Sequence, residues 1–288
     1  MKSTNSPKAR FIAALWTLNE HPTASKEWSL ERKIRAIKEA GFDGFATVLN
    51  PEHQRLAKKY ELMMIGFIVS NHSKEIRKML LENKKNGAHY INVHLGKEDT
   101  LTPEALRLAL RMMEDAAELG LEPSIETHRN TCTETPEKTY ALADAYWKAT
   151  GKLLPLTLDY SHHAVVKHLT TQDFVKRLLV QPKLIQRAGL VHLRPFNGHH
   201  AQVPVTDGNG KITQEVKDWL PLVDAFFKIW RQGKQAGREL FIYPELGPVL
   251  SGYNLHSLPK SWEDARVLTK ILRKHWNASG AISTKKDS

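Results

Sequence analysis

Short apolar segments alternate with longer amphipathic segments along almost the whole chain. The apolar segments are short and are followed by loop or helix signals, which is typical of buried strands. We expect eight such strands, at residues 10–18, 43–49, 62–70, 89–95, 122–128, 154–160, 190–195 and 240–245. The segments between these strands carry the spacing and the start signals of helices.

The predicted helices begin at capping signals. Asn50 is followed by proline and then by glutamate, and the same pattern recurs at Thr102 and Thr135. A side chain of this kind can accept a backbone hydrogen bond, and proline suits the first helical position. We therefore expect each of these three residues to be the N-cap of a helix.

Apolar stripes indicate which helix faces are buried. One stripe is formed by Leu30, Ile34, Ile37 and Ala40, and Gly41 follows it as a stop signal. A second stripe is formed by Leu106, Leu110, Met113 and Ala117, with Gly120 just beyond the helix. We expect both stripes to lie against the core.

Eight alternations of strand and helix in about 250 residues are typical of a (β/α)8 TIM barrel. We expect a single-domain α/β barrel over residues 10–276, with flexible segments at 1–9 and 277–288. A doubly wound open sheet is the structural alternative, although no glycine-rich phosphate loop follows the first strand. Residues 196–214 form the longest segment without periodicity, and we expect them to cover the mouth of the barrel.

Length and composition narrow the class of protein. The chain has 288 residues, of which 41% are hydrophobic, enough for one large domain with a sizeable core. No apolar stretch approaches the roughly 18 residues that cross a bilayer, and the polar N-terminus lacks the features of a secretory signal. Cys132 is the single cysteine, which excludes an internal disulfide and indicates a reducing compartment. We expect a cytoplasmic protein that has no membrane partner.

The formal net charge of +11 could attract nucleic acid or a phosphorylated substrate. However, the basic residues are spread along the whole chain, and the densest groups, at 32–38 and 58–59, are typical of solvated helix faces. We therefore do not expect nucleic acid to be a partner.

Four predicted strands in succession end in a residue that can bind a metal. These residues are Glu126, Asp159, His192 and Glu245. If the strands are parallel and close into a barrel, the four side chains converge on one mouth. Three carboxylates and one imidazole describe a site for a single divalent ion, and the oxygen-rich set favours Mn2+, with Mg2+, Co2+ or Zn2+ as alternatives.

Further polar and aromatic residues should border this site. Side chains two residues apart on a strand point to the same side, and strand ends face the mouth. By these criteria the candidates for substrate binding are His128, Arg194, His162, His94 and Trp16.

Several motifs resemble those of one known superfamily. They are Ile-Glu-Thr-His at 125–128, Leu-Asp-Tyr-Ser-His at 158–162, Val-His-Leu-Arg at 191–194, Pro-Glu-Leu-Gly-Pro at 244–248, Gly-Phe-Asp-Gly at 41–44 and Gly-Ala-His-Tyr-Ile-Asn-Val-His at 87–94. In this order they resemble the xylose isomerase-like TIM barrel superfamily, especially its sugar phosphate isomerase/epimerase branch. The resemblance spans roughly residues 10–275.

The resemblance implies a chemistry as well as a fold. It implies that Glu126, Asp159, His192 and Glu245 hold one divalent ion, and that Glu126 and Glu245 are also the acid/base pair. The implied reaction is isomerisation or epimerisation of a small sugar, by proton abstraction next to a carbonyl through a metal-stabilised ene-diolate. Substrate oxygens would be bound by His162, Arg194 and Gln202. Barrels of this kind often associate, so a homo-oligomer is compatible with the resemblance.

Two features depart from the family pattern. Epimerases of this group often carry a further arginine a few residues beyond the histidine ligand, where this chain has Gly-His-His at 198–200. The Thr-Cys-Thr-Glu-Thr loop at 131–135 is polar and could contact the substrate. Both features leave the substrate open.

Three alternative functions remain open from the sequence. A lyase or dehydratase acting on a keto-sugar or keto-glycoside would begin with the same proton abstraction. An abasic-site DNA endonuclease of the same superfamily would need three zinc ions and an Asp-x-His motif, where this chain has Asp-Gly-Asn at 207–209. The residues that fall near the positions of such a cluster are His72, His94, Glu126, Asp159, His162, His192 and Glu245. A barrel that binds sugar without turnover would not need two carboxylate bases.

Overall fold

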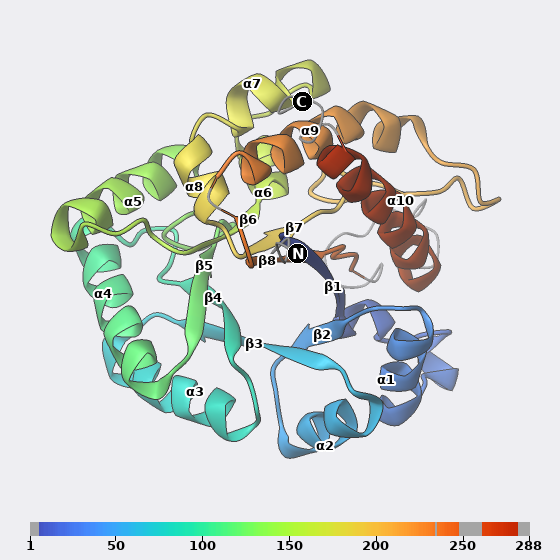
Figure 1. Cartoon of the computed structure of the whole chain (residues 1–288), viewed down its shortest axis with the longest axis horizontal. Coiled ribbons are helices and arrows are strands. Elements are labelled where there is room, and N and C mark those ends of the chain that lie inside the picture. Colours follow the sequence, from blue (N-terminus) through green and yellow to red (C-terminus); the bar gives the residue numbers. More distant parts are fainter. Residues whose placement is uncertain (1–5, 234, 248–260, 282–288) are drawn as a thin grey trace, which may run out of the picture.

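The eight predicted strands are present and close into a parallel barrel. The computed structural model describes residues 6–233, 235–247 and 261–281. The strands are β1 (Lys8–Ala14), β2 (Gly44–Thr47), β3 (Met63–Ser70), β4 (Tyr90–Leu95), β5 (Glu122–Glu126), β6 (Leu156–Asp159), β7 (Leu190–His192) and β8 (Glu239–Tyr243). Each strand pairs with the next, and β8 pairs with β1, so the barrel prediction is confirmed and an open sheet is excluded (Figure 1).

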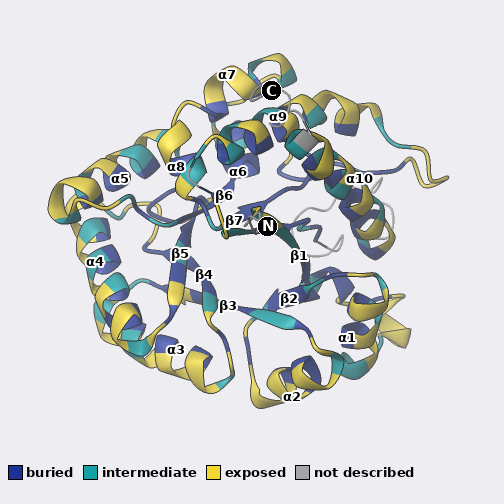
Figure 2. Cartoon of the chain, in the orientation of Figure 1, coloured by how far each residue is buried: buried dark blue, intermediate teal, exposed yellow. Residues whose placement is uncertain are grey.

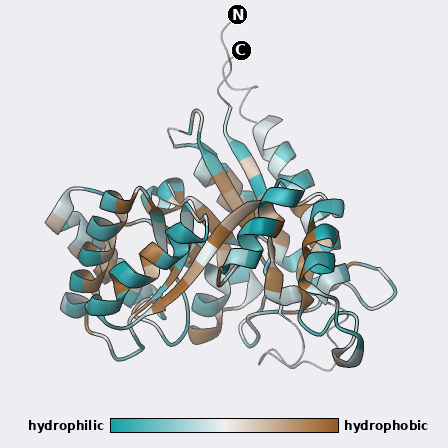
Figure 3. Cartoon of the chain, turned by 90° about the horizontal axis from the view of Figure 1, so that it is seen from below, coloured by the Kyte–Doolittle hydropathy of each residue, from teal (hydrophilic) through white to brown (hydrophobic). Residues whose placement is uncertain are grey.

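Helices form a ring around the barrel (Figure 1). They are α1 (Leu30–Glu39), α2 (Pro51–Tyr60), α3 (Ser73–Lys85), α4 (Thr102–Leu119), α5 (Pro136–Thr150), α6 (Tyr160–Val166), α7 (Phe174–Leu178), α8 (Pro182–Arg187), α9 (Gln214–Arg231) and α10 (Ser261–Ala281). Short 3-10 turns are η1 (Leu15–Leu18), η2 (Ala24–Lys26) and η3 (Thr171–Asp173). The helices bury their inner faces and expose their outer faces (Figure 2), and hydrophobic residues concentrate along the strands (Figure 3). No described helix is both long and apolar enough to cross a membrane.

Two of the three predicted N-caps are confirmed. The side chain of Asn50 accepts hydrogen bonds from the backbone of α2, and that of Thr135 accepts one from the backbone of α5. The prediction at Thr102 is wrong, because the chain becomes helical one residue earlier and Thr102 is itself the first residue of α4. Leu101 takes the N-cap position, where it offers no side-chain acceptor.

The buried face of α4 lies beside the predicted stripe. The fully buried residues of this helix are Ala105, Leu108, Ala109, Met112, Asp115 and Ala116. Leu106, Leu110 and Met113 are partly buried and pack against the edge of the core, whereas Ala117 is exposed, so the predicted stripe lies to one side of the fully buried face. Small alanines on the inner face let the helix approach the strands closely, and the larger side chains fill the space beside it. In α1, by contrast, Ile34 and Ile37 are fully buried as predicted.

A second, smaller core fills the inside of the barrel. It contains Ile12, Ala14, Ala46, Ile65, Leu190, Phe241 and Tyr243. These side chains close the lumen, as in barrels of this type, so that ligands can approach only from one end or the other. In barrels of this type the active site lies at the carboxyl ends of the strands, which is where the predicted ligands are expected.

The segment after β7 is irregular and packs against α10. Val203 and Val205 are buried, and the Asp264 carboxylate on α10 accepts hydrogen bonds from the backbone of Val205 and Thr206. Of the expected flexible termini, residues 1–5 and 282–288 lie outside the described residues. β1 begins at Lys8 and α10 continues to Ala281, so both elements extend past the predicted barrel boundaries at residues 10 and 276.

Candidate active site

The four predicted metal ligands meet at the carboxyl ends of β5 to β8. Glu126, Asp159 and His192 are the last residues of their strands, and Glu245 follows the end of β8. The strand register places Asp159 beside His192 and His192 beside Tyr243. Consecutive parallel strands thus carry their terminal side chains to the same level of the mouth.

His192 lies at the centre of this group. Its Nδ1 atom is 3.2 Å from Glu126 Oε1, 3.2 Å from Glu245 Oε2 and 3.6 Å from Asp159 Oδ2. One ligand atom from each of the four residues lies within 4.8 Å of the others. Donors around one ion, each about 2.1–2.5 Å from it, have separations in this range.

The donor set fits a divalent cation. His192 Nε2 is buried without a hydrogen-bond partner in the described part of the chain, and His192 Nδ1 and Glu245 Oε2 have ion-pair contacts but no hydrogen bond there. Buried polar atoms without partners are rare, because each costs about 1–3 kcal/mol. A cation bound among these atoms would satisfy the imidazole and the carboxylates together.

The charged groups of the site shift one another's pKa values. Although burial opposes it, the pKa of Glu126 is lowered by His192 and His94, and that of Asp159 is lowered by Arg194 and His162. Burial also opposes charge on His192, yet Glu126 and Glu245 raise its pKa well above the ordinary value. In the metal-free protein Glu126 and Asp159 are therefore ionised and His192 carries a proton.

Residues that the sequence analysis missed hold two of the ligands in place. Asn92 on β4 donates to Glu126 Oε2 at 2.5 Å, beside His94, which donates to the same atom at 2.8 Å. Ser161 donates to Asp159 Oδ1 from its backbone at 2.9 Å and from its hydroxyl at 2.5 Å. Asn92 could have been found, because it lies two residues before His94 and so on the same side of β4.

Arg194 lies among the predicted ligands. Its Nη2 donates to Asp159 Oδ2 at 2.6 Å and to His162 Nε2 at 3.1 Å, and its Nε donates to Ser161 Oγ at 3.2 Å. Its Nη1 is 3.1 Å from Glu245 Oε2. Because it donates to His162, that imidazole is neutral, in agreement with burial, which lowers the pKa of His162 well below its ordinary value. Arg194 therefore neutralises part of the negative charge that a metal would also neutralise.

A cavity of about 320 Å³ opens above the site. It is lined by Trp16, Ala46, Thr47, Val48, Gly66, Phe67, Asn92, His94, Glu126, His128, Arg129, His192, Tyr243 and Glu245. The structure thus brings the predicted residues Trp16, His94 and His128 into one cavity with three of the metal ligands. Tyr243, which the sequence analysis missed, lies with its ring centroid 4.6 Å from that of His192.

The other predicted substrate-binding residues are not among those that line this cavity. His162 and Arg194 are buried beside Asp159, and the ring centroid of His162 is 4.1 Å from that of His128. The Gln202 amide donates to Gly247 O at 3.1 Å and accepts from Gly247 N at 2.7 Å. The Gln202 side chain therefore holds the backbone of Gly247 in place.

A second group of potential ligands shares one carboxylate with the first. It consists of His94, Glu126 and His128. The rings of His94 and His128 are stacked, with centroids 3.9 Å apart, and burial lowers the pKa of His128 to about 4. His128 is therefore neutral near pH 7 and can serve as a ligand or as a hydrogen-bond partner.

Comparisons with known proteins agree on the fold. No protein-family model matches the sequence, and a sequence search finds no match among curated proteins. The structure of L-ribulose 3-epimerase is 14% identical and matches with a TM-score of 0.63, covering 97% of this chain and 98% of that one. D-allulose 3-epimerase from Methylomonas sp., solved in complex with D-allulose, is 13% identical with a TM-score of 0.61, covering 94% and 98%. A xylose isomerase domain containing protein from Salmonella typhimurium is 16% identical with a TM-score of 0.59, covering 95% and 96%.

Each of these matches extends over nearly the full length of both chains, so the similarity concerns the whole barrel and not one motif. At such low sequence identity it establishes the architecture, in agreement with the closed eight-stranded barrel described above. The resemblance inferred from the sequence motifs is confirmed at this level. The chain has the fold of the xylose isomerase-like TIM barrel superfamily.

Proposed function

We propose that the protein is a divalent-metal-dependent sugar isomerase or epimerase. The observation that carries this proposal is the convergence of Glu126, Asp159, His192 and Glu245 within 4.8 Å at the carboxyl ends of four consecutive strands. Active sites of barrels of this type lie at that end. The structural similarity to L-ribulose 3-epimerase and D-allulose 3-epimerase supports a small sugar as the substrate.

The metal would be held by these four residues. Three carboxylates and one imidazole favour Mn2+, Mg2+ or Co2+. Structural zinc, by contrast, prefers ligand sets rich in cysteine sulfur. When bound, such an ion polarises a carbonyl and stabilises negative charge on neighbouring oxygens.

Two glutamates would move the proton. Glu126 and Glu245 reach the site from different strands, and each has a carboxylate oxygen 3.2 Å from His192 Nδ1. One of them removes the proton from the carbon next to the carbonyl, and the other returns a proton to the resulting ene-diolate. Asn92 and His94 hold the Glu126 carboxylate in position by donating to its Oε2.

The cavity would orient the sugar. Trp16 offers an aromatic face, and ring nitrogens are offered by His94 on β4 and by His128, just beyond the adjacent strand β5. Arg194 and His162 would act from behind the cavity, where they form a connected hydrogen-bond network with Asp159. Such a network restrains the rotamers of the groups that bind and react.

A solvent-exchange experiment tests the proposal. The metal-reconstituted protein is incubated with L-ribulose, D-allulose and related keto-sugars in deuterated water, and deuterium next to the carbonyl is followed by NMR. We expect deuterium incorporation together with an isomerised or epimerised product. A product that has lost water or an aglycone would instead support the lyase. Absence of both exchange and product from a broad panel would leave the barrel as a binding protein.

The endonuclease alternative receives less support. His72, which a three-metal site would use, is the N-cap residue of α3 and belongs to neither group of potential ligands among the described residues.

A further inference from the structure

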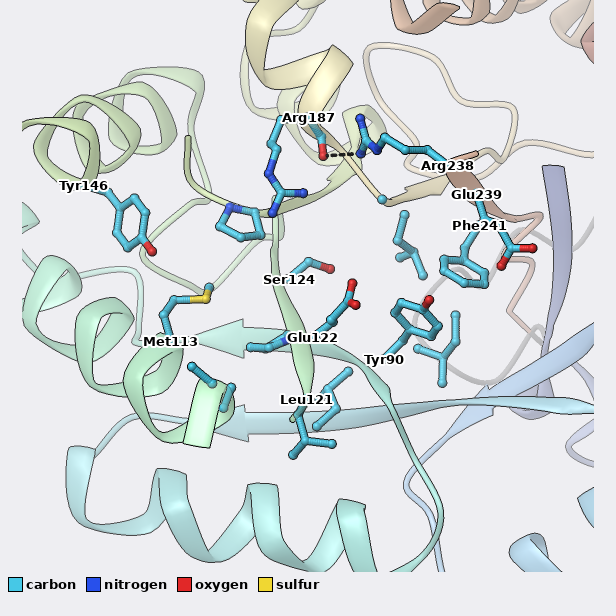
Figure 4. Close-up of a pocket in the computed structure, with 18 of the residues that line it drawn as sticks. Tyr90, Met113, Leu121, Glu122, Ser124, Tyr146, Arg187, Arg238, Glu239 and Phe241 are labelled. Carbon is cyan, nitrogen blue, oxygen red and sulfur yellow. Dashed lines mark hydrogen bonds between the residues drawn. The ribbon is translucent and has the colours of Figure 1, made fainter. Parts of the chain in front are cut away.

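A second pocket lies at the opposite end of the barrel. Its volume is about 650 Å³, and it is lined by the amino-terminal parts of the strands and by residues of α4, α5 and α8 (Figure 4). Ile65, Leu190 and Phe241 line this basal pocket and also belong to the core that fills the lumen. The basal pocket is therefore separated from the metal site by packed side chains.

Two arginines line the basal pocket without an ion pair to any carboxylate in the described part of the chain. Arg187 makes no ion pair with any residue in the described ranges. Arg238 donates from Nη1 to Gln186 O at 2.6 Å and to Gln235 Oε1 at 2.6 Å, and from Nη2 to Arg187 O at 2.9 Å. These acceptors are neutral. Figure 4 places Arg187 and Arg238 side by side, with the Arg187 guanidinium pointing into the space.

The acidic residues of the basal pocket have other partners. Glu239 accepts two bonds from the Arg10 guanidinium, both at 2.7 Å. Glu122 lies 3.2 Å from His89, and its side chain is 65% exposed, so solvent screens much of its charge. Burial and then the like charge of Arg187 lower the pKa of Arg238, whereas Glu122 acts in the opposite direction more weakly. Because one lining glutamate is paired with Arg10 and the other is exposed to solvent, the positive charge of Arg187 and Arg238 is only partly compensated within the basal pocket.

The walls suit an organic ligand. The rings of Tyr90 and Phe241 have centroids 4.4 Å apart and form an aromatic side of the pocket. Ser124 and Tyr146 contribute hydroxyl groups, and the Tyr146 hydroxyl points toward the space in Figure 4. A volume of about 650 Å³ is in the range of small-molecule sites and exceeds what a bare inorganic ion needs.

We propose that the basal pocket binds a small organic oxyanion, a phosphate or carboxylate that carries an apolar ring. Arg187 and Arg238 pair with the oxyanion, since guanidinium groups bind such groups through charge-assisted hydrogen bonds. The ring of the ligand packs on the side formed by Tyr90 and Phe241. The site does not depend on the metal or on the sugar reaction.

Calorimetric titration of the full chain tests this proposal. The probes are phenyl phosphate and benzoate, with phenol as the uncharged analogue and inorganic phosphate as the anion without a ring. We expect an organic anion to bind more tightly than phenol and more tightly than inorganic phosphate, with the same affinity before and after chelation of divalent metal. Saturable binding by neither organic anion at millimolar concentration would overturn the proposal, and so would binding that chelation abolishes.

Substitution of Arg187 locates the site. Arg187 is exposed at the end of α8, so Arg187→Gln should leave the fold intact. We expect this variant to weaken binding of the organic anion on the order of tenfold or more, the usual effect of losing a charged hydrogen bond. The matched control is Arg177→Gln, at an exposed arginine of α7, which should bind like the parent protein. Equal affinity in Arg187→Gln and the parent protein would contradict the assignment.

Discussion

His192 is the central residue of the candidate metal site, because carboxylate oxygens of Glu126, Asp159 and Glu245 all lie close to its Nδ1 atom. In the metal-free protein the surrounding carboxylates raise the pKa of this imidazole, so the ring is protonated near neutral pH. A metal ion binds only the neutral ring, and it must therefore displace that proton. Proton and metal compete for one residue.

This competition predicts the pH dependence of metal binding. Below the raised pKa of His192, each metal ion bound releases a proton, so affinity rises with pH by about tenfold per unit. Titration with Mn2+ by calorimetry at several pH values, in buffers of different ionisation enthalpy, measures both the affinity and the proton released. A dissociation constant that stays flat between mildly acidic and mildly basic pH would contradict a protonated His192.

Arg194 competes with the metal in a different way. It lies 2.6 Å from Asp159 Oδ2 and 3.1 Å from Glu245 Oε2, so its fixed positive charge already stabilises two of the ligands. In Arg194→Met we expect the metal-free protein to lose about 3 kcal/mol of stability, because a buried carboxylate loses its partner. The same change should increase metal affinity, since one competing cation is gone. Denaturation of the metal-free variant measures its stability, and Mn2+ titration measures its metal affinity. If both equal those of the parent protein, Arg194 does not contribute to the electrostatics of the site.

The two glutamates can be tested as bases. Glu245→Gln keeps an oxygen ligand but removes the base, so we expect a folded protein whose deuterium exchange falls by about 100-fold or more. Glu104→Gln, at an exposed position of α4, is the matched control. Exchange at the parental rate in Glu245→Gln would exclude Glu245 from proton transfer.

At the scale of elements, the existence of each strand could be predicted because buried parallel strands are short apolar runs. The ends of the strands could not be predicted, because closure of the barrel and not composition decides where pairing stops. The strand predicted over residues 190–195, for example, is confined to Leu190–His192 in β7. The four ligands were visible because each ends such a run. Asn92, Ser161 and Tyr243 were harder to find, since their roles arise only where neighbouring strands meet.

The buried face of α4 shows how packing overrides a stripe. Leu108 is fully buried on its inner face, whereas Leu106 is only partly buried. We expect Leu108→Ala to lower the free energy of unfolding by about 2–5 kcal/mol, the usual cost of a cavity in a core. Leu106→Ala should cost less than half as much, because its site is partly open to solvent. Urea denaturation compares the pair, and equal losses would mean that both residues contribute alike to the core.

At the scale of the whole molecule, the barrel separates two ends with different chemistry. The carboxyl end gathers Glu126, Asp159, His192 and Glu245, and the amino end gathers Arg187 and Arg238 around the basal pocket. The sequence predicted the first end from the order of its motifs. The sequence did not predict the pocket at the amino end. Arg187 ends α8 and Arg238 directly precedes β8, and only the closed barrel brings these distant segments together.

Metal content per chain tests the central claim most directly. The protein is purified, loaded with Mn2+, dialysed and examined by elemental mass spectrometry, beside Glu126→Ala prepared in the same way. We predict about one equivalent of Mn2+ per chain, removed by a chelator, restored on reloading and lost in the variant. A chain that retains no divalent ion under any condition, or one that retains the same amount in Glu126→Ala, would contradict a metal site built from these four residues.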